Sequence, residues 1–312
     1  MAGELGRRTF VTGSMFGAGI LAQSRPAAAS RSPQRRWHSP PPALARQGIA
    51  ELPEVKLWFS DTGGTGEPLI LLHPGTGSGM VWPYQQAAFS QAGYRVITYS
   101  RRGHAGSEAG PATDVGTAAD DLDHLATFLE LETFHLLGTA AGGFVAADYA
   151  VSFPERLRSL IIACSQGGVT DPAFREKIAA LVPPALRQVP ASIRELGPSY
   201  RAGNPEGTRE WERLEHGSRS VPARIRQRFR NDMTWAMIAR IKTPTLLIAG
   251  GADLLSPPTL MLDIAERLAR VEFEVLPESG HSGYWEQPEA FNAIVVEFLR
   301  KNGASAARAA ER

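Results

Sequence analysis

The sequence predicts a doubly wound α/β fold built around a mostly parallel sheet, and two observations carry this prediction. Largely apolar runs occur at residues 69–72, 157–164 and 245–249, and such runs are typical of strands buried on both faces of a parallel sheet. Segments with the apolar spacing of helices separate them, which implies right-handed strand–helix–strand crossovers. With 312 residues, 43% of them hydrophobic, the chain can bury a large core.

Strands and helices alternate through the first half of the sheet region. Residues 55–60 alternate apolar and polar side chains, as a half-exposed strand does. Residues 94–99 repeat the strand pattern after a helix-length segment at 81–92. Residues 117–130 have apolar side chains near the helical spacing, with two aspartates in the first turn, where the helix dipole favours them. This order predicts helical crossovers between neighbouring strands.

The second half continues the same alternation. The apolar run at 134–137 ends in a glycine-rich turn that leads into a predicted helix at 144–151. Residues 271–276 alternate as a last strand, and residues 288–300 form a closing amphipathic helix. The sheet region therefore comprises residues 51–168 and 241–302.

A helical insertion separates these two parts. Residues 169–240 contain no convincing strand, only short helical stretches separated by prolines. An insertion between two strands of an open α/β sheet lies over the carboxyl ends of the strands, where such sheets bind ligands. We therefore expect residues 169–240 to form a lid.

The two ends of the chain are expected to lie outside the fold. Residues 1–29 carry an Arg7-Arg8 pair, a short apolar run and three alanines, which are features of a twin-arginine-type export signal. Residues 30–50 are rich in proline and arginine and are interpreted as a linker, and residues 303–312 as a disordered tail. We expect export to the periplasm or out of the cell. A tail with a chance arginine pair is the alternative.

The composition excludes several classes of protein. A formal net charge of +1 provides no field for nucleic acid. The only cysteine, Cys164, excludes an intramolecular disulfide and a cysteine zinc site. The apolar run near the amino terminus is too short to span a membrane. We expect a small-molecule substrate, no nucleic-acid partner and no stable membrane insertion, and the oligomeric state is left open.

The turn at residues 138–143 has the composition of a nucleophile elbow. Such an elbow needs small residues two positions before and two after the reactive side chain, because the sharp turn has no room for a Cβ atom. Gly138 and Gly142 meet this requirement. The residue at the apex is Ala140, which has no atom that could attack a substrate. An ordinary glycine-rich turn between a strand and a helix is the alternative interpretation.

Five segments, taken in order, resemble the α/β-hydrolase superfamily and in particular its small lidded members. The resemblance covers about residues 55–301. The five segments are residues 71–78, which contain His73-Pro74-Gly75-Thr76, residues 99–107, the turn at 138–143, residues 247–253, which end in Asp253, and residues 277–281, which end in His281. In that family these correspond to the oxyanion loop, the loop after the next strand, the elbow, the catalytic acid and the catalytic histidine. The order of nucleophile, acid and histidine is also that of the family.

The resemblance implies a role for each of these residues. Ala140 occupies the nucleophile position, Asp253 is the acid and His281 is the general base, since an unperturbed histidine titrates near neutrality. His73 would hold its loop in place. The nearest rival acid, Asp263, is expected to face water because it lies in an apparent helix.

The remaining site residues follow from the same comparison. Backbone N–H groups of Ala141 and of Gly75 or Thr76 would form the oxyanion hole, since the proline of the loop has no N–H to give. Ordinary core packing is an alternative role for each candidate pocket residue; these candidates are Trp82, Tyr84, Phe144, Trp211, Trp235 and Met237.

No cofactor or metal is implied. The glycine-rich residues 75–79 lack the Lys-Ser/Thr ending of a phosphate loop.

Three functions are compatible with an alanine at the elbow. The first is a hydrolase of a small, largely apolar ester, lactone or carbon–carbon bond next to a carbonyl, with Ala140 either an engineered knockout of a serine or a natural variant. The second is a lyase, isomerase, cyclase or cofactor-free oxygenase that uses His281 as a base without a nucleophile. The third is a non-catalytic binder of a small ligand. We take the first as the leading hypothesis because hydrolysis is the commonest activity of the superfamily.

Overall fold

The computed structural model describes residues 45–221 and 225–303. The predicted signal at 1–29, most of the predicted linker and residues 304–312 of the predicted tail lie outside the described residues.

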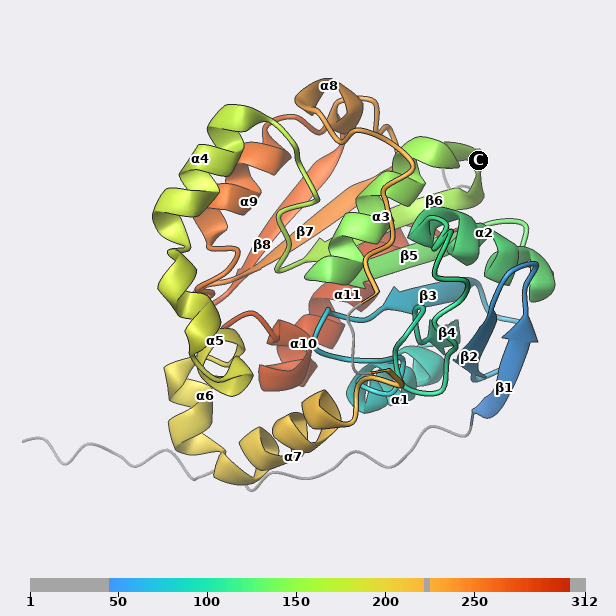
Figure 1. Ribbon diagram of the computed structural model, residues 1–312, viewed down its shortest axis with the longest axis horizontal. Coiled ribbons are helices and arrows are strands. Elements are labelled where there is room, and N and C mark those ends of the chain that lie inside the picture. Colours follow the sequence, from blue (N-terminus) through green and yellow to red (C-terminus); the bar gives the residue numbers. More distant parts are fainter. Residues whose placement is uncertain (1–44, 222–224, 304–312) are drawn as a thin grey trace, which may run out of the picture. The chain divides into compact units, whose positions relative to one another are not determined.

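One eight-stranded sheet forms the centre of the fold, in the order β1-β2-β4-β3-β5-β6-β7-β8 (Figure 1). The strands from β4 to β8 pair in parallel, whereas β1 and β2 pair antiparallel at one edge. The predicted doubly wound, mostly parallel sheet is therefore confirmed. Its strands are β1 Arg46–Glu51, β2 Lys56–Asp61, β3 Pro68–Leu72, β4 Arg95–Tyr99, β5 Phe134–Thr139, β6 Leu157–Ala163, β7 Thr245–Gly250 and β8 Val271–Leu276.

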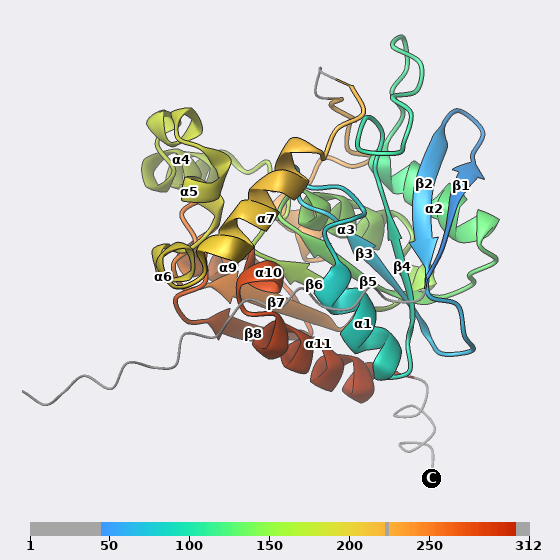
Figure 2. The ribbon, with the colours of Figure 1, turned by 90° about the horizontal axis from the view of Figure 1, so that it is seen from below.

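Helices cover both faces of the sheet, and β3 shows how the two faces divide. Ile70 and Leu72 belong to a hydrophobic cluster with α2, α3 and α9, whereas Leu69 and Leu71 belong to a second cluster with α1 and α11. Alternate residues of a strand point to opposite faces, so one apolar run serves both layers. Figure 2 shows α1 and α11 side by side beneath the sheet. The helices are α1 Pro83–Gln91, α2 Ala118–Phe128, α3 Ala141–Ser152, α9 Pro258–Ala265, α10 Gly283–Glu286 and α11 Pro288–Asn302.

The first strand corrects the prediction of a linker up to residue 50. Residues 46–51 form β1, which pairs with β2 along its whole length. Only Ala50 of this strand is buried. Because the other positions do not need apolar side chains, the sequence of the strand lacks the apolar–polar alternation that would predict it. Its conformation is set by hydrogen bonding to β2.

The segment between β6 and β7 is helical. Its described part contains no strand of the sheet and forms α4 Pro172–Leu181, η2 Pro184–Gln188, α5 Ala191–Glu195, α6 Pro198–Gly203, α7 Pro205–His216 and α8 Trp235–Ile238. The prolines that interrupt the sequence begin helices α4, α6 and α7, because a proline at the first helical position loses no hydrogen bond. No helix in the described ranges is both long and apolar enough to span a bilayer.

Candidate active site

The turn between β5 and α3 has the geometry of a nucleophile elbow. β5 ends at Thr139, α3 begins at Ala141, and Ala140 between them has φ 51° and ψ −117°. A positive φ is rare for a residue with a Cβ atom and costs about 1–3 kcal/mol. The backbone N–H of Ala140 donates to Ala163 at the end of β6 (3.0 Å). The turn is thus sharp and fixed to the neighbouring strand.

Both flanking glycines are required by close backbone contacts. A Cβ atom on Gly138 would lie 2.3 Å from the carbonyl oxygen of Gly142, and one on Gly142 would lie 2.2 Å from the carbonyl oxygen of Leu72. No real Cβ atom approaches an oxygen so closely. The second contact also places the start of α3 against the end of β3.

This contact places the start of α3 beside Leu72 and His73, where the predicted oxyanion loop begins. Ala141 is the first residue of α3, so its N–H has no partner within the helix. Gly75 and Thr76 follow β3 in a turn that the Gly77 N–H closes by donating to Pro74 (3.2 Å). The positive end of the α3 dipole adds to the attraction of this region for a developing negative charge.

His73 lies within the same loop as a structural residue. Its ring is fully buried, Nδ1 lies 2.7 Å from the carbonyl oxygen of Pro74, and Nε2 accepts the Arg101 backbone N–H (3.0 Å). Burial, together with the nearby Arg101 guanidinium, lowers the pKa of His73 well below its ordinary value. The neutral ring is hydrogen-bonded through both nitrogens, to Pro74 and to Arg101, and so fixes the loop that follows β3.

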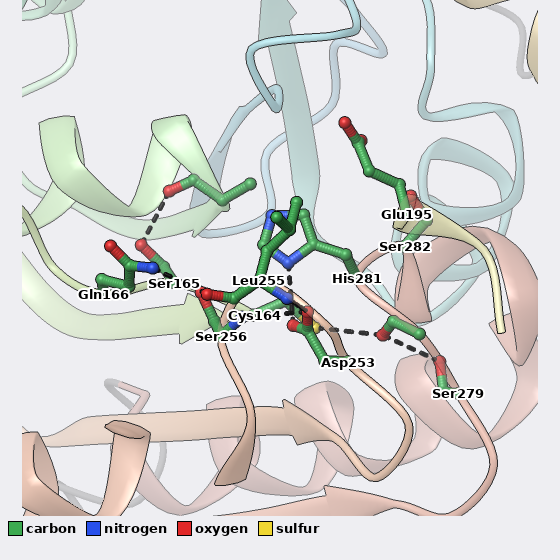
Figure 3. Close-up of polar contacts among 12 residues, drawn as sticks. Cys164, Ser165, Gln166, Glu195, Asp253, Leu255, Ser256, Ser279, His281 and Ser282 are labelled. Carbon is green, nitrogen blue, oxygen red and sulfur yellow. Dashed lines mark hydrogen bonds and ion pairs between the residues drawn. The ribbon is translucent and has the colours of Figure 1, made fainter. Parts of the chain in front are cut away.

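The two predicted acid–base residues form a buried pair. Asp253 follows β7 and His281 follows β8; the His281 Nδ1 lies 2.8 Å from the Asp253 Oδ2 (Figure 3). The Asp253 Oδ1 accepts the backbone N–H groups of Leu255 (2.7 Å) and Ser256 (3.0 Å). Because the carboxylate oxygen Oδ2 accepts the hydrogen bond of the His281 ring, the proton lies on Nδ1, and Nε2 of the neutral ring carries none.

Two opposing effects set the proton affinity of His281. Burial lowers the pKa of the ring, but the carboxylates of Asp253, Glu195 and Glu286 together outweigh it, so the pKa is raised above 6.5. The imidazolium formed by proton uptake is therefore stabilised within the site.

The end of β6 connects the elbow to the histidine loop. The Ser165 hydroxyl donates to the Ala140 carbonyl (2.7 Å), and the Cys164 Sγ lies 3.8 Å from the carbonyl oxygen of Gly280, the residue before His281. Ala140 and His281 are each only 7% exposed. The elbow and the base thus share one nearly closed edge of the sheet.

Two carboxylates of this region were not predicted. Glu286 accepts the N–H groups of Gly280 (3.0 Å) and Gly197 (2.8 Å), and burial raises its pKa to about 7. Glu195, at the end of α5, accepts the Thr76 hydroxyl (2.7 Å). The bonds of Gly197 to Glu286 and of Thr76 to Glu195 join the helical insertion to the rest of the site, and a sequence pattern does not reveal such contacts.

A small cavity adjoins the oxyanion loop and has a volume of about 10 Å³, close to the space that one water occupies. Trp211 contributes to its wall and donates from Nε1 to the Ser282 hydroxyl (3.2 Å). The wall consists of Thr76, Gly77, Val81, Trp211, Leu214, Glu215, Tyr284 and Trp285. Trp211 is thus the one predicted pocket residue that lines this cavity.

The other predicted pocket residues pack elsewhere. The Trp82 ring centroid is 4.7 Å from that of Tyr284, and Tyr84 packs edge-on against Trp285 at 5.4 Å. These two contact residues of the cavity wall but do not line the cavity themselves.

Three further candidates have packing partners outside this wall. The ring centroids of Phe144 and Phe229 are 6.3 Å apart, and those of Trp235 and Phe174 of α4 are 4.9 Å apart. Met237 shares the short helix α8 with Trp235. Ile238 and Trp235 of α8 join the hydrophobic cluster that contains residues of α3, so packing accounts for Trp235.

The rival acid Asp263 pairs with a lysine, and His216, another histidine of the chain, is largely exposed. The Asp263 carboxylate on α9 lies 2.6 Å from the Lys177 Nζ, and the side chain of His216 is 79% exposed. Within residues 45–221 and 225–303, no three histidine, cysteine or acidic side chains gather in an arrangement that could hold a metal ion.

Comparison with known proteins agrees with this geometry. Residues 69–294 match the model of the alpha/beta hydrolase family. The chain belongs to the α/β-hydrolase family. This confirms the resemblance on which the site was predicted.

The relatives of the chain have several activities. It is 29% identical over 273 residues to a 2-hydroxy-6-oxononadienedioate/2-hydroxy-6-oxononatrienedioate hydrolase of Paraburkholderia phymatum, covering 79% of this chain and 91% of the relative. It is 31% identical over 244 residues to a protein of Caulobacter sp. (strain K31) assigned as a putative carbamate hydrolase. The match covers 74% of this chain and 90% of the relative. Among solved structures, a thermophilic esterase from Thermogutta terrifontis is similar, with a TM-score of 0.65, 26% identity and 82% and 99% coverage.

Proposed function

We propose that this chain is an α/β-hydrolase-type enzyme that acts on a small, largely apolar carbonyl compound, with His281 as the base and without a covalent nucleophile. The observation that carries the proposal is the buried His281–Asp253 pair, joined at 2.8 Å, at the same edge of the sheet as an elbow whose apex is Ala140. A non-catalytic ligand binder has no use for a base at this position. We therefore favour an enzyme over a binder.

The mechanism we propose is the addition of activated water. The carbonyl oxygen of the substrate lies against the N–H groups of Ala141 and of Gly75 or Thr76, and the His281 Nε2 takes a proton from a water molecule. The resulting hydroxide adds to the carbonyl carbon and gives a tetrahedral oxyanion. When the bond to the leaving group breaks, the imidazolium returns its proton to that group. Asp253 stabilises the imidazolium between these two steps.

A covalent route through the elbow does not fit an alanine. Removing the nucleophile of a serine triad costs about a millionfold in turnover, whereas binding and the oxyanion hole retain a residual acceleration of roughly a thousand- to ten-thousandfold. Ser165 is no substitute, because its buried hydroxyl already donates to the Ala140 carbonyl (2.7 Å). Water is the remaining nucleophile for hydrolysis.

The charges around the site favour a substrate without a carboxylate. Glu195 and Glu215 lie at or near the wall of the cavity, and tryptophan and tyrosine side chains form much of the rest. A dianionic substrate such as a nonadienedioate would bring two further negative charges toward these carboxylates. An ester, a lactone or a neutral diketone would not.

The test is hydrolysis of 4-nitrophenyl butyrate by the full chain. We expect His281→Ala to lower kcat/KM by about a hundredfold or more. The control His216→Ala removes an exposed histidine and should keep kcat/KM within about twofold of the parent value. Because the base must be neutral and its pKa is raised, activity should fall as the pH drops through a midpoint above 6.5. Equal turnover by the parent and His281→Ala would rule the proposal out.

The substitution Ala140→Ser separates the proposal from two alternatives. If the site works through water, serine should change the His281-dependent rate by less than about tenfold. A gain of several orders of magnitude would instead favour a serine hydrolase whose nucleophile is missing. If butyrate hydrolysis is absent and His281-dependent exchange of the α-protons of cyclohexanone with D2O is present, the reaction is a proton abstraction, as in a lyase or isomerase.

Export is a separate proposal that rests on the twin-arginine pair of residues 1–29. Replacing Arg7-Arg8 by two lysines should retain the protein inside the cell. Unchanged export would contradict it.

A further inference from the structure

Glu195 is a buried carboxylate beside the base that the mechanism above does not use. It is the last residue of α5 in the helical insertion. Its backbone carbonyl accepts the N–H groups of His281 (2.7 Å) and Ser282 (3.2 Å). Figure 3 shows Glu195 beside the loop that carries these two residues. The insertion is therefore bonded directly to the histidine loop.

The side chain of the same residue contacts the other half of the site. The Glu195 Oε2 accepts the Thr76 hydroxyl at 2.7 Å, and the Arg194 Nε lies 3.6 Å from Oε1. Thr76 belongs to the loop that supplies the predicted oxyanion donors. One residue of the insertion thus joins the oxyanion loop and the histidine loop.

The charge of Glu195 acts on the base. Burial raises the pKa of Glu195, and Glu215 raises it further, whereas His281, Thr76 and Arg194 lower it. In return, the Glu195 carboxylate favours the protonated form of His281. The two groups therefore interact electrostatically within the closed site.

We propose that Glu195 is a positioning residue that compensates for the absent serine, by bonding the insertion to both loops and by placing a further negative charge beside His281. This inference rests on the proposed function, in which His281 acts without a covalent nucleophile. A serine at the elbow would present its hydroxyl to the base in a fixed position. A water molecule has no such attachment, so the orientation and strength of the base decide the rate.

An NMR titration of the His281 ring in the full chain tests the charge without requiring activity. We compare the parent with Glu195→Gln, which keeps the size and the acceptor oxygen and removes the charge. The midpoint should move to lower pH in Glu195→Gln and return toward the parent value in Glu195→Asp, which restores the charge. An unchanged midpoint in Glu195→Gln would overturn the inference.

Glu212→Gln is the matched control. The Glu212 Oε1 accepts the Ser192 hydroxyl (2.6 Å), so this carboxylate also contacts α5, from α7. The substitution removes one charge next to the same helix without touching either loop of the site. It should leave the His281 titration where it is in the parent; an equal shift in Glu212→Gln would assign the effect to the helix rather than to Glu195.

Kinetics on 4-nitrophenyl butyrate test the positioning. Glu195→Gln and Thr76→Val, which removes the hydroxyl that Glu195 accepts, should each lower kcat about tenfold or more with KM within about threefold. Near-ultraviolet circular dichroism checks that each variant is folded, and Thr76→Val provides a second arm should Glu195→Gln be unstable. Parent values of kcat in both variants would overturn the inference. Turnover that survives His281→Ala would instead overturn the proposed function, so the two failures are distinguishable.

Discussion

The two halves of the site differ in what they retain. At the elbow, Ala140 keeps the positive φ of a nucleophile turn, 51°, but has no reactive atom. At the ends of β7 and β8, Asp253 and His281 keep their reactive atoms and their 2.8 Å contact. The difference indicates that the shape of the elbow has a use apart from holding a nucleophile. In the proposed mechanism, that use is to aim the N–H of Ala141 at the carbonyl oxygen of the substrate.

The largest expected effect is the loss of turnover when the Asp253–His281 pair is broken. Asp253→Asn should lower kcat on 4-nitrophenyl butyrate by about a thousand- to ten-thousandfold, because an amide no longer fixes the tautomer of His281. Asp263→Asn is the matched control, since Asp263 pairs with Lys177 away from the base. A loss of less than about tenfold in Asp253→Asn, or an equal loss in Asp263→Asn, would show that the pair does not act as a unit.

The second prediction concerns the shape of the elbow. Gly142→Ala would place a Cβ atom 2.2 Å from the carbonyl oxygen of Leu72, so α3 must move away from the oxyanion loop. We expect a loss of about 1–3 kcal/mol in urea unfolding, or more, together with lower turnover. Gly203→Ala, where a Cβ atom meets nothing within 4 Å, should stay within about 0.5 kcal/mol. If Gly142→Ala is as stable and active as the parent, the close contact of Gly142 with Leu72 at the end of β3 is not needed for the proposed oxyanion hole.

The smallest effect measures the strain that the elbow stores. Ala140→Gly removes the Cβ atom at a positive φ, but glycine loses more backbone entropy on folding. These terms nearly offset each other, so we expect a gain in stability of about 1 kcal/mol or less and little change in turnover. A clear loss of stability would show that the alanine at this position is not strained.

The sequence predicts the elbow and the acid–base residues because local chemistry dictates them. Only glycine fits at positions 138 and 142, where backbone atoms approach within 2.3 Å of a Cβ position. Asp253 and His281 each follow a recognisable strand, and parallel strands bring their carboxyl ends to one edge. The strand ends, together with the resemblance to the family, therefore suffice to predict where these residues lie.

Other parts depend on contacts that no local pattern encodes. β1 has one buried residue and forms only by pairing with β2. Glu195 reaches Thr76 across 119 positions of sequence, and its role follows from how the insertion docks. Trp235 is predicted to line a pocket because it is aromatic, but it packs against Phe174. Aromatic side chains are common in hydrophobic cores as well as in binding sites, so residue type alone does not separate the two.

The most direct test of the account is the intact mass of the chain during turnover. Samples are quenched rapidly while the Ala140 protein hydrolyses 4-nitrophenyl butyrate, with His281→Ala as the control. We predict the unmodified mass throughout the steady state, alongside hydrolysis that requires His281. A fraction of the chain heavier by one butyryl group, formed only when His281 is present, would contradict the claim that the site works without a covalent nucleophile.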